Sequence, residues 1–176
     1  MKRAIFLDRD GVINRAYVRE GKPYPPSGLA ELEILSGVEQ ALTKLRSAGF
    51  LLIVVTNQPD VSRGIVERET VLEINNHLAQ RLPLDEFRVC FHDNGDGCGC
   101  RKPLPGALLE SAKIHDIDLS KSCVVGDRWL DIEAGRRAGC STIFIDNGYD
   151  EKQPESADHR VASLSDAARI ILEKMI

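Results

Sequence analysis

The amino-acid sequence predicts a doubly wound α/β fold, in which helices cover both faces of a parallel sheet. Short apolar runs alternate with longer segments of helical periodicity, which is the pattern of strand–helix–strand units. The runs are rich in Val, Ile, Leu and Phe, as expected for strands buried on both faces. With 176 residues, the chain is long enough for one compact core, so we expect a single domain over residues 1–176.

The first part of the chain gives two predicted strands and one predicted helix. Residues 4–7 form the first apolar run, and residues 20–28, with three prolines and two glycines, form a loop. The apolar residues within 38–45 recur at helical spacing, and Gly49 is suited to end that helix. Residues 50–55 follow as a continuous apolar strand.

The rest of the chain repeats the alternation. Pro105 is suited to begin a helix and Gly139 to end one, and residues 147–158 form a second polar loop. The predicted strands are residues 87–91, 123–125 and 142–145, and the predicted helices are residues 71–82, 105–112, 132–138 and 165–175.

Composition and charge exclude several classes of protein. The chain is 43% hydrophobic and 28% charged, close to an ordinary globular protein, which argues against a disordered or fibrous chain. The net charge of -4 without a basic stripe makes a nucleic acid an unexpected partner. The apolar stretch before Asp8 is too short for a signal peptide or a membrane span, so we expect a cytoplasmic protein without membrane contact.

Two acids follow the first predicted strand directly. Asp8 and Asp10 lie two residues apart, and Gly11 permits the sharp turn that such a strand end needs. Carboxylates at this spacing can share a divalent cation, one acting as nucleophile and the other as acid or base. The alternative is an ordinary Asp-Gly turn with solvated acids.

Two further sets of polar residues suit a phosphoryl group. Thr56, Asn57 and Gln58 follow the strand at residues 50–55, and their hydroxyl and amide groups can bond phosphoryl oxygens, although such residues also form turns and caps. Arg101 and Lys102 are adjacent cations that can neutralise a phosphoryl group, although such a pair usually lies on the surface.

A last acid follows the strand at residues 123–125. Asp127 can complete a set of oxygen ligands for Mg²⁺, and Asp131 lies one helical turn further on as a supporting group. Alone, Asp127 could simply be an acid favoured by a helix N-terminus. Because open parallel sheets bind ligands beyond the carboxyl ends of their strands, the four strand-end sets together indicate one site.

The order of these residues resembles that of the haloacid dehalogenase-type phosphohydrolases, from Asp8 to about Tyr149. The resemblance implies a Rossmann-like fold and a role for each residue. Asp8 would attack phosphorus and Asp10 would protonate the leaving oxygen, while Thr56 and Lys102 would bind the phosphoryl group. The magnesium ion implied by the resemblance would be held by Asp8, Asp10 and Asp127.

Three cysteines and one histidine within eleven positions suit a zinc ion. In an extended segment, Cys90 and His92 face the same side, and the glycine-rich stretch after them can return Cys98 and Cys100 to the same ion. Four protein ligands leave no open coordination position, so we expect a structural zinc that orders the loop 90–100. Free or redox-active thiols are the alternative.

The same loop resembles that of a smaller group within this family. Cys-x-His and Cys-x-Cys pairs before Arg-Lys-Pro are similar to those of the heptose bisphosphate phosphatases and the related histidinol phosphatases. This implies removal of the 7-phosphate of D-glycero-D-manno-heptose 1,7-bisphosphate through a phosphorylated aspartate. Substrate contacts would come from Asn57, Gln58, Arg101, Arg128 and the loop around Tyr17.

Two departures from that group concern the substrate loop and the zinc loop. Pro59-Asp60 stands where the group often has Ser-Gly, and Phe91 replaces a proline common between the Cys and the His. The first departure leaves the chemistry intact but puts the identity of the sugar in question.

The sequence leaves other functions open. Histidinol phosphate is the main alternative substrate, and a nucleic-acid end phosphatase fits the charge less well. A receiver-like phospho-acceptor would need neither the zinc loop nor Asp10, and a non-catalytic zinc module would not need the five catalytic positions. The short intervals from Asp8 to Thr56 and on to Lys102 leave no room for a large cap domain, so we expect a capless monomer that selects a small phosphorylated sugar through short loops.

Overall fold

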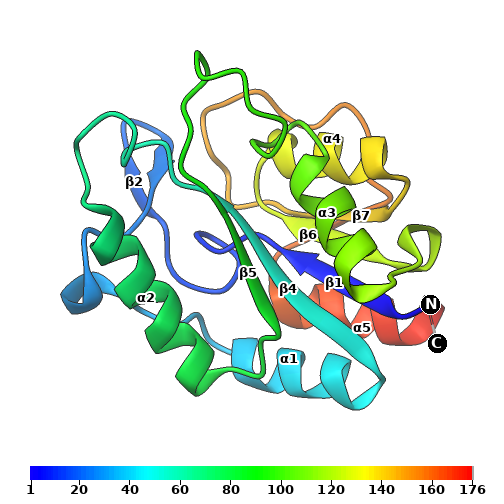
Figure 1. Cartoon of the computed structure of the whole chain (residues 1–176). Coiled ribbons are helices and arrows are strands. Elements are labelled where there is room, and N and C mark those ends of the chain that lie inside the picture. Colours follow the sequence, from blue (N-terminus) through cyan, green and yellow to red (C-terminus); the bar gives the residue numbers. More distant parts are fainter. Residues whose placement is uncertain (176) are drawn as a thin grey trace.

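In the computed structural model, which describes residues 1–175, six parallel strands form one sheet in the order β5-β4-β1-β6-β7-β8 (Figure 1). This is the predicted parallel sheet. Its strands are β1 (Arg3–Leu7), β4 (Phe50–Asn57), β5 (Glu86–Cys90), β6 (Cys123–Gly126), β7 (Ser141–Ile145) and β8 (His159–Val161).

Helices cover both faces of the sheet, as the sequence predicts. Within residues 1–175 they are α1 (Val38–Ser47), α2 (Arg68–Arg81), α3 (Gly106–His115), α4 (Trp129–Ala138) and α5 (Leu164–Lys174), with short 3-10 turns at Leu29–Glu31 and Leu119–Lys121. None of these helices combines the length and the apolar character that crossing a bilayer requires.

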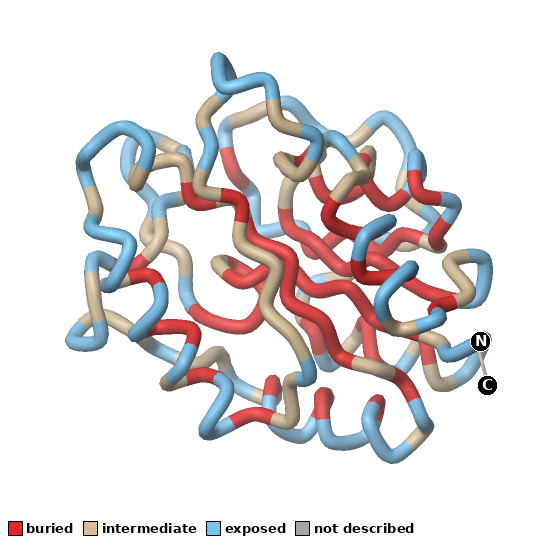
Figure 2. The backbone as a smooth tube through the Cα atoms, in the orientation of Figure 1, coloured by how far each residue is buried: buried red, intermediate tan, exposed pale blue. Residues whose placement is uncertain are grey.

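The alternation of side chains along β1 explains why two layers of helices form. Ile5 and Leu7 pack in one hydrophobic core with α1, α2 and α5, whereas Ala4 and Phe6 pack in a second core with α3 and α4. All four side chains are at most 1% exposed. Figure 2 shows the resulting buried band along the central strands, with exposed residues on the outer loops.

Two features differ from the sequence prediction. The loop predicted at residues 20–28 contains a strand, because Lys22–Tyr24 (β3) pairs antiparallel with Tyr17–Arg19 (β2). The turn between them places Glu20 and Gly21 at φ 50 and 76, which matches the twist of a tight hairpin. Strand β8 was not predicted, because it has only three residues at the sheet edge and no apolar run in the sequence marks it.

The order of the strands determines where the polar residues meet. Strands β4, β1 and β6 are neighbours and parallel, so their carboxyl ends lie at the same edge of the sheet. Thr56 lies at the end of β4, Asp8 follows β1 and Asp127 follows β6. The chain between β1 and β4 adds only the β2–β3 hairpin, a 3-10 turn and α1, which agrees with the expected absence of a cap among the described residues.

Candidate active site and metal centre

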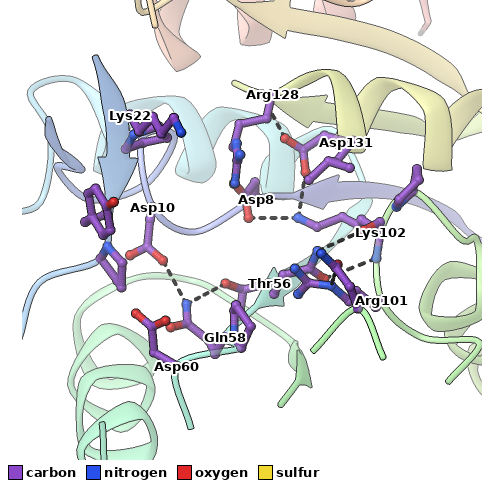
Figure 3. Close-up of a pocket in the computed structure, with 18 of the residues that line it drawn as sticks. Asp8, Asp10, Lys22, Thr56, Gln58, Asp60, Arg101, Lys102, Arg128 and Asp131 are labelled. Atoms are coloured by element: carbon purple, nitrogen blue, oxygen red, sulfur yellow. Dashed lines mark hydrogen bonds and ion pairs between the residues drawn. The ribbon is translucent and has the colours of Figure 1, made fainter. Parts of the chain in front are cut away.

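A cavity of about 500 Å³ lies at the carboxyl ends of the strands (Figure 3). It brings together nine of the predicted site residues from segments that are far apart in the sequence. These residues are Asp8, Asp10, Thr56, Asn57, Gln58, Arg101, Lys102, Arg128 and Asp131.

Lys102 lies between two carboxylates at the floor of the cavity. Its Nζ donates hydrogen bonds to Asp8 Oδ1 at 2.8 Å and to the Val55 carbonyl at 2.6 Å, and it is 2.6 Å from Asp131 Oδ1. The side chain is only 4% exposed. Burial opposes its charge, but Asp131 and Asp8 raise the pKa of Lys102 above its ordinary value, so the ammonium stays charged. A fixed cation beside Asp8 can neutralise an anionic group bound there.

Three acids gather at the same point. One carboxylate oxygen from each of Asp8, Asp127 and Asp131 lies within 4.8 Å of the others. Burial and the neighbouring acids raise the pKa of Asp127 well above its ordinary value, and burial also raises the pKa of Asp8 although Lys102 opposes that shift. Such a group of buried acids favours a divalent cation, which would relieve their mutual repulsion.

Asp127 also carries an unused ligand atom. Its Oδ1 is buried and has no hydrogen-bond partner among the described residues, whereas Oδ2 accepts a bond from Tyr149. Buried carboxylate oxygens without a partner are costly, so this atom fits the position of a metal ligand. The donor set consists of hard oxygens, which suits Mg²⁺.

The Asp10 carboxylate points away from the acid group and is held by three donors. Arg9 donates to both of its oxygens at 3.0–3.1 Å, Asn14 donates to Oδ1 at 3.0 Å and Gln58 donates to Oδ2 at 2.8 Å. The Asp131 carboxylate joins those of Asp8 and Asp127 in the group of acids, and the role of Asp10 as a magnesium ligand stays a prediction. Asp10 lines the cavity, where it can exchange a proton with a bound group.

The two amides at the end of β4, those of Asn57 and Gln58, hold other site residues in place. Gln58 Nε2 donates to Thr56 Oγ1 at 2.9 Å in addition to Asp10, so both of its donor hydrogens have partners. Asn57 forms a reciprocal pair with the backbone of Lys102, with both distances 3.1 Å. These contacts give the two amides an orienting function beside the predicted substrate contacts.

The four predicted zinc ligands converge. The Sγ atoms of Cys90 and Cys100 are 3.2 Å apart, and His92 Nδ1 lies 3.6 Å from Cys90 Sγ and 3.4 Å from Cys100 Sγ. Cys98 Sγ is 3.7 Å from Cys90 Sγ. Ligand atoms in a tetrahedral zinc site are separated by roughly 3.5–3.8 Å, so this group can hold a metal ion without a large rearrangement.

The cations at the cavity rim are mostly tied to acids or carbonyls. Arg128 forms a bidentate pair with Glu151 at 2.6–3.0 Å, and Arg101 donates to Asn94 Oδ1 at 2.9 Å. Burial opposes the charge of Arg128, but Glu151 raises its pKa. Lys22, from the β2–β3 hairpin, also lines the cavity.

Residues 22–25, in and directly after the β2–β3 hairpin, line the cavity. Tyr17 donates its hydroxyl hydrogen to the Glu31 carbonyl at 2.7 Å, whereas Tyr24 lines the cavity. A substrate contact from the loop around Tyr17 stays a prediction. Tyr17 and Tyr24 are paired across the hairpin, so their side chains share one face of it, and the sequence alone does not tell which of them reaches the cavity.

Sequence reasoning missed the residues that hold the site residues. Asn147, Tyr149 and Glu151 lie in the loop after β7, which was predicted only as polar, yet they contact Asp127 and Arg128. Their position directly after a strand is the same signal that identified Asp8, and it could have identified Asn147. Arg9 has no role in the sequence prediction, yet the structure buries it fully.

Known proteins resemble this chain over nearly its whole length. A family model described as HAD-hydrolase-like matches residues 99–167. The D-glycero-beta-D-manno-heptose-1,7-bisphosphate 7-phosphatase of Pasteurella multocida is 34% identical, covering 97% of each chain. The D-glycero-alpha-D-manno-heptose-1,7-bisphosphate 7-phosphatase of Mycobacterium bovis is 38% identical over 80% of this chain and 78% of the relative.

A solved structure agrees with these relatives. The D,D-heptose 1,7-bisphosphate phosphatase of B. bronchiseptica, complexed with magnesium and phosphate, superimposes with a TM-score of 0.83 and 31% identity, covering 98% of this chain and 99% of the other. The predicted resemblance is confirmed, and the chain is a hydrolase of phosphate monoesters. It belongs to the haloacid dehalogenase-like phosphatases, in the group that contains the heptose-1,7-bisphosphate 7-phosphatases.

Proposed function

We propose that this enzyme removes the 7-phosphate of D-glycero-D-manno-heptose 1,7-bisphosphate through a phosphorylated Asp8. The observation that carries the proposal is the position of Asp8 at the cavity floor, 2.8 Å from the buried ammonium of Lys102. The relatives from Pasteurella multocida and Mycobacterium bovis, which bear the names of 7-phosphatases, supply the identity of the sugar. Because those two names specify different anomers, the proposal covers both.

The reaction proceeds in two transfers. Asp8 attacks phosphorus in line, the bond between phosphorus and the sugar oxygen breaks, and Asp10 donates a proton to the departing alkoxide. Asp10 then accepts a proton from the water that attacks the phosphoryl group on Asp8. Inorganic phosphate leaves, and the Asp8 carboxylate is restored. Lys102 and Thr56 bind the phosphoryl oxygens throughout.

Asp8 and Asp127 would hold a magnesium ion, with Asp131 beside them. The buried Oδ1 of Asp127 and the raised pKa of Asp127 support this assignment. When bound, the ion supplies positive charge that offsets the charge of the phosphoryl oxygens. Asp131 also contacts Lys102 at 2.6 Å, so it orients the cation on the opposite side of Asp8.

Zinc is the metal that we propose for the Cys90, His92, Cys98 and Cys100 group. Its three sulfurs and one nitrogen match the preference of Zn²⁺, and four protein ligands make the site structural. Arg101 and Lys102 follow the last ligand directly, so zinc would order the segment that carries both cations.

The second phosphate of the substrate would lie near the rim of the cavity. Lys22, Arg101 and Arg128 come from three different segments and all line the cavity, as Figure 3 shows. A sugar bisphosphate carries two anionic groups, and the cavity offers Lys102 for one and the rim cations for the other. The expected single domain, monomeric state and cytoplasmic location stay predictions, which limited proteolysis, size-exclusion chromatography and cell fractionation would check.

The test measures phosphate release from heptose 1,7-bisphosphate, heptose 7-phosphate and histidinol phosphate under the same conditions. We expect the bisphosphate to have the highest kcat/KM and ³¹P NMR to show loss of the 7-phosphate. Asp8→Asn should abolish turnover while the circular dichroism spectrum stays unchanged, since the nucleophile is lost and the packing is retained. Retained turnover in Asp8→Asn, or preference for histidinol phosphate, would contradict the proposal.

A further inference from the structure

Two side chains from the segment after β7 converge on the carboxylate of Asp127. The Tyr149 hydroxyl donates to Asp127 Oδ2 at 2.6 Å, and Asn147 Nδ2 lies 3.2 Å from the same oxygen. Asn147 Nδ2 is also 3.0 Å from the Gly11 carbonyl and 3.1 Å from the Tyr149 hydroxyl. One network therefore joins the turn after β1, the end of β6 and the end of β7.

The network treats the two oxygens of Asp127 differently. Oδ2 accepts both bonds, whereas Oδ1 is buried and has no partner among the described residues. Tyr149 is only 8% exposed, and its hydroxyl donates to Oδ2 and not to Oδ1.

The turn after β1 packs closely against this network. A Cβ at Gly11 would lie 1.8 Å from Asp127 Oδ2 and 2.7 Å from the Tyr149 oxygen, so the turn after β1 can pass this close only as glycine. Gly11 also has a φ of +87, which favours glycine independently. Rotation of the Asp127 carboxylate would break the bonds to Tyr149 and Asn147.

We infer that Tyr149, supported by Asn147, positions Asp127 so that only Oδ1 is offered to the catalytic cation, which makes the site discriminate Mg²⁺ from Ca²⁺. Ca²⁺ accepts bidentate carboxylates and six to eight ligands, whereas Mg²⁺ requires near-octahedral geometry at about 2.0–2.1 Å and disfavours a bidentate carboxylate. A carboxylate whose second oxygen is held by a phenol can bind in one mode only. The inference rests on the proposed metal site and adds the residue that controls its selectivity.

The experiment is calorimetric titration of the zinc-loaded, full-length protein with Mg²⁺ and with Ca²⁺, without substrate. Tyr149→Phe removes the donor and keeps the ring. Because partners of metal ligands typically contribute 10–100-fold to affinity, we expect Mg²⁺ to bind about tenfold more weakly. We expect Ca²⁺ to bind equally well or more tightly, so that the Mg²⁺ dissociation constant rises relative to the Ca²⁺ dissociation constant. Asn147→Ala should move it in the same direction by a smaller factor.

Tyr17→Phe is the matched control for metal binding, because it removes a hydroxyl that donates at 2.7 Å to the Glu31 carbonyl, away from the acid group. Its Mg²⁺ and Ca²⁺ affinities should equal those of the wild type. A merely structural role of Tyr149 would lower the melting temperature and leave the ratio of dissociation constants unchanged. That result in both Tyr149→Phe and Asn147→Ala would overturn the inference, as would a wild type that binds no Mg²⁺. Substrate turnover is measured separately, so failure of the sugar assignment would not be mistaken for either result.

Discussion

At the scale of single residues, the most unusual side chain at the site is Arg9, which is fully buried. Its guanidinium donates to both oxygens of Asp10 and, through Nη1, to Asn75 Oδ1 at 2.9 Å. Asn75 lies on α2, so Arg9 connects the proposed acid to a helix on the flank of the sheet. A buried cation with such a fork of bonds fixes the orientation of the carboxylate that it contacts.

Arg9→Lys tests this orienting role. Lysine keeps the charge but cannot bond both Asp10 oxygens and Asn75 Oδ1 at the same time. Proton donation by Asp10 to the leaving group should therefore become inefficient. General acid catalysis contributes about 10²–10⁴-fold, so we expect the first turnover of an alkyl phosphate to slow by about 10²-fold. The first turnover of p-nitrophenyl phosphate should change much less, because its leaving group departs without a proton. Rapid-quench kinetics measures the rate of the first turnover for each ester. An equal loss of rate for both esters would contradict the orienting role of Arg9.

Residues on this scale were predictable where one local signal was enough. Asp8 and Asp127 each come directly after an apolar strand and Thr56 follows the apolar run inside β4, so the strand-end rule found them. Tyr149 and Asn75 could not be found in the same way, because their roles depend on contacts with residues 22 and 66 positions away. The orientation of Asp10 likewise follows from its tertiary partners and not from its distance to Asp8.

At the scale of elements, the loop 90–100 is linked to the segment that follows β4. Arg63 donates to both oxygens of Asp93 at 2.7 Å and to Asp60 at 3.1 Å, and Ser62 donates to Asp96 at 3.0 Å. Asp60, Arg63 and Asn94 all line the cavity. Exposed ion pairs contribute little individually, but a bidentate pair on the loop that carries the proposed zinc ligands can hold the rim of the cavity in one arrangement.

Removal of the proposed zinc should therefore act on substrate binding more than on chemistry. In Cys98→Ser we expect zinc content to fall, the melting temperature to drop and KM for the bisphosphate to rise about tenfold, equivalent to 1.4 kcal/mol. The kcat should fall less, because Lys102 keeps its bonds to Asp8, Val55 and Asn57 from other segments. Cys140→Ser is the matched control, since this thiol is buried outside the group and its loss should leave zinc content unchanged. A fall in kcat with constant KM would contradict the assignment.

The elements themselves show what sequence patterns can predict. The two-sided burial of β1, β4 and β6 leaves continuous apolar runs, which identified these strands directly. The β2–β3 hairpin has alternating polar residues and a proline, and its strands have three residues each, so its pattern is not distinguishable from a loop. The hairpin nevertheless supplies Lys22 and Tyr24 to the cavity, which is why the substrate side of the site was predicted less well than the reacting side.

At the scale of the whole molecule, the charge of the site affects the stability of the fold. Asp8, Asp127 and Asp131 lie close together, and the Lys102 ammonium contacts only Asp8 and Asp131, so the group carries excess negative charge when all three acids are ionised. Burial raises the pKa of Asp8 and that of Asp127 above the ordinary value of an aspartate. The folded state therefore holds protons that the unfolded chain has released, and in that pH range the free energy of unfolding decreases as the pH rises.

The decrease in the free energy of unfolding with rising pH predicts how magnesium and pH together affect the melting temperature. Without divalent ions, the melting temperature should fall between pH 5 and pH 7, and Mg²⁺ should raise it more at pH 7 than at pH 5, because the ion binds the ionised acids of the folded state. At a concentration of 100 times Kd the gain is about 2.7 kcal/mol, which corresponds to roughly 5–10 °C for a chain of this size. Differential scanning calorimetry at the two pH values, with EDTA-treated protein reloaded with zinc alone, measures both effects.

Asp127→Asn separates this electrostatic origin from a general effect of salt. The amide is nearly isosteric and removes the buried charge, so without Mg²⁺ the variant should be more stable than the wild type at pH 7. Its melting temperature should depend less on pH, and Mg²⁺ should raise it by only a small fraction of the wild-type shift. A variant that is destabilised at pH 7, or one that Mg²⁺ stabilises as strongly as the wild type, would show that the three carboxylates do not repel one another in the folded state. Asp127 would then contribute to the fold as an ordinary hydrogen-bonded group, and the cation would have to bind elsewhere.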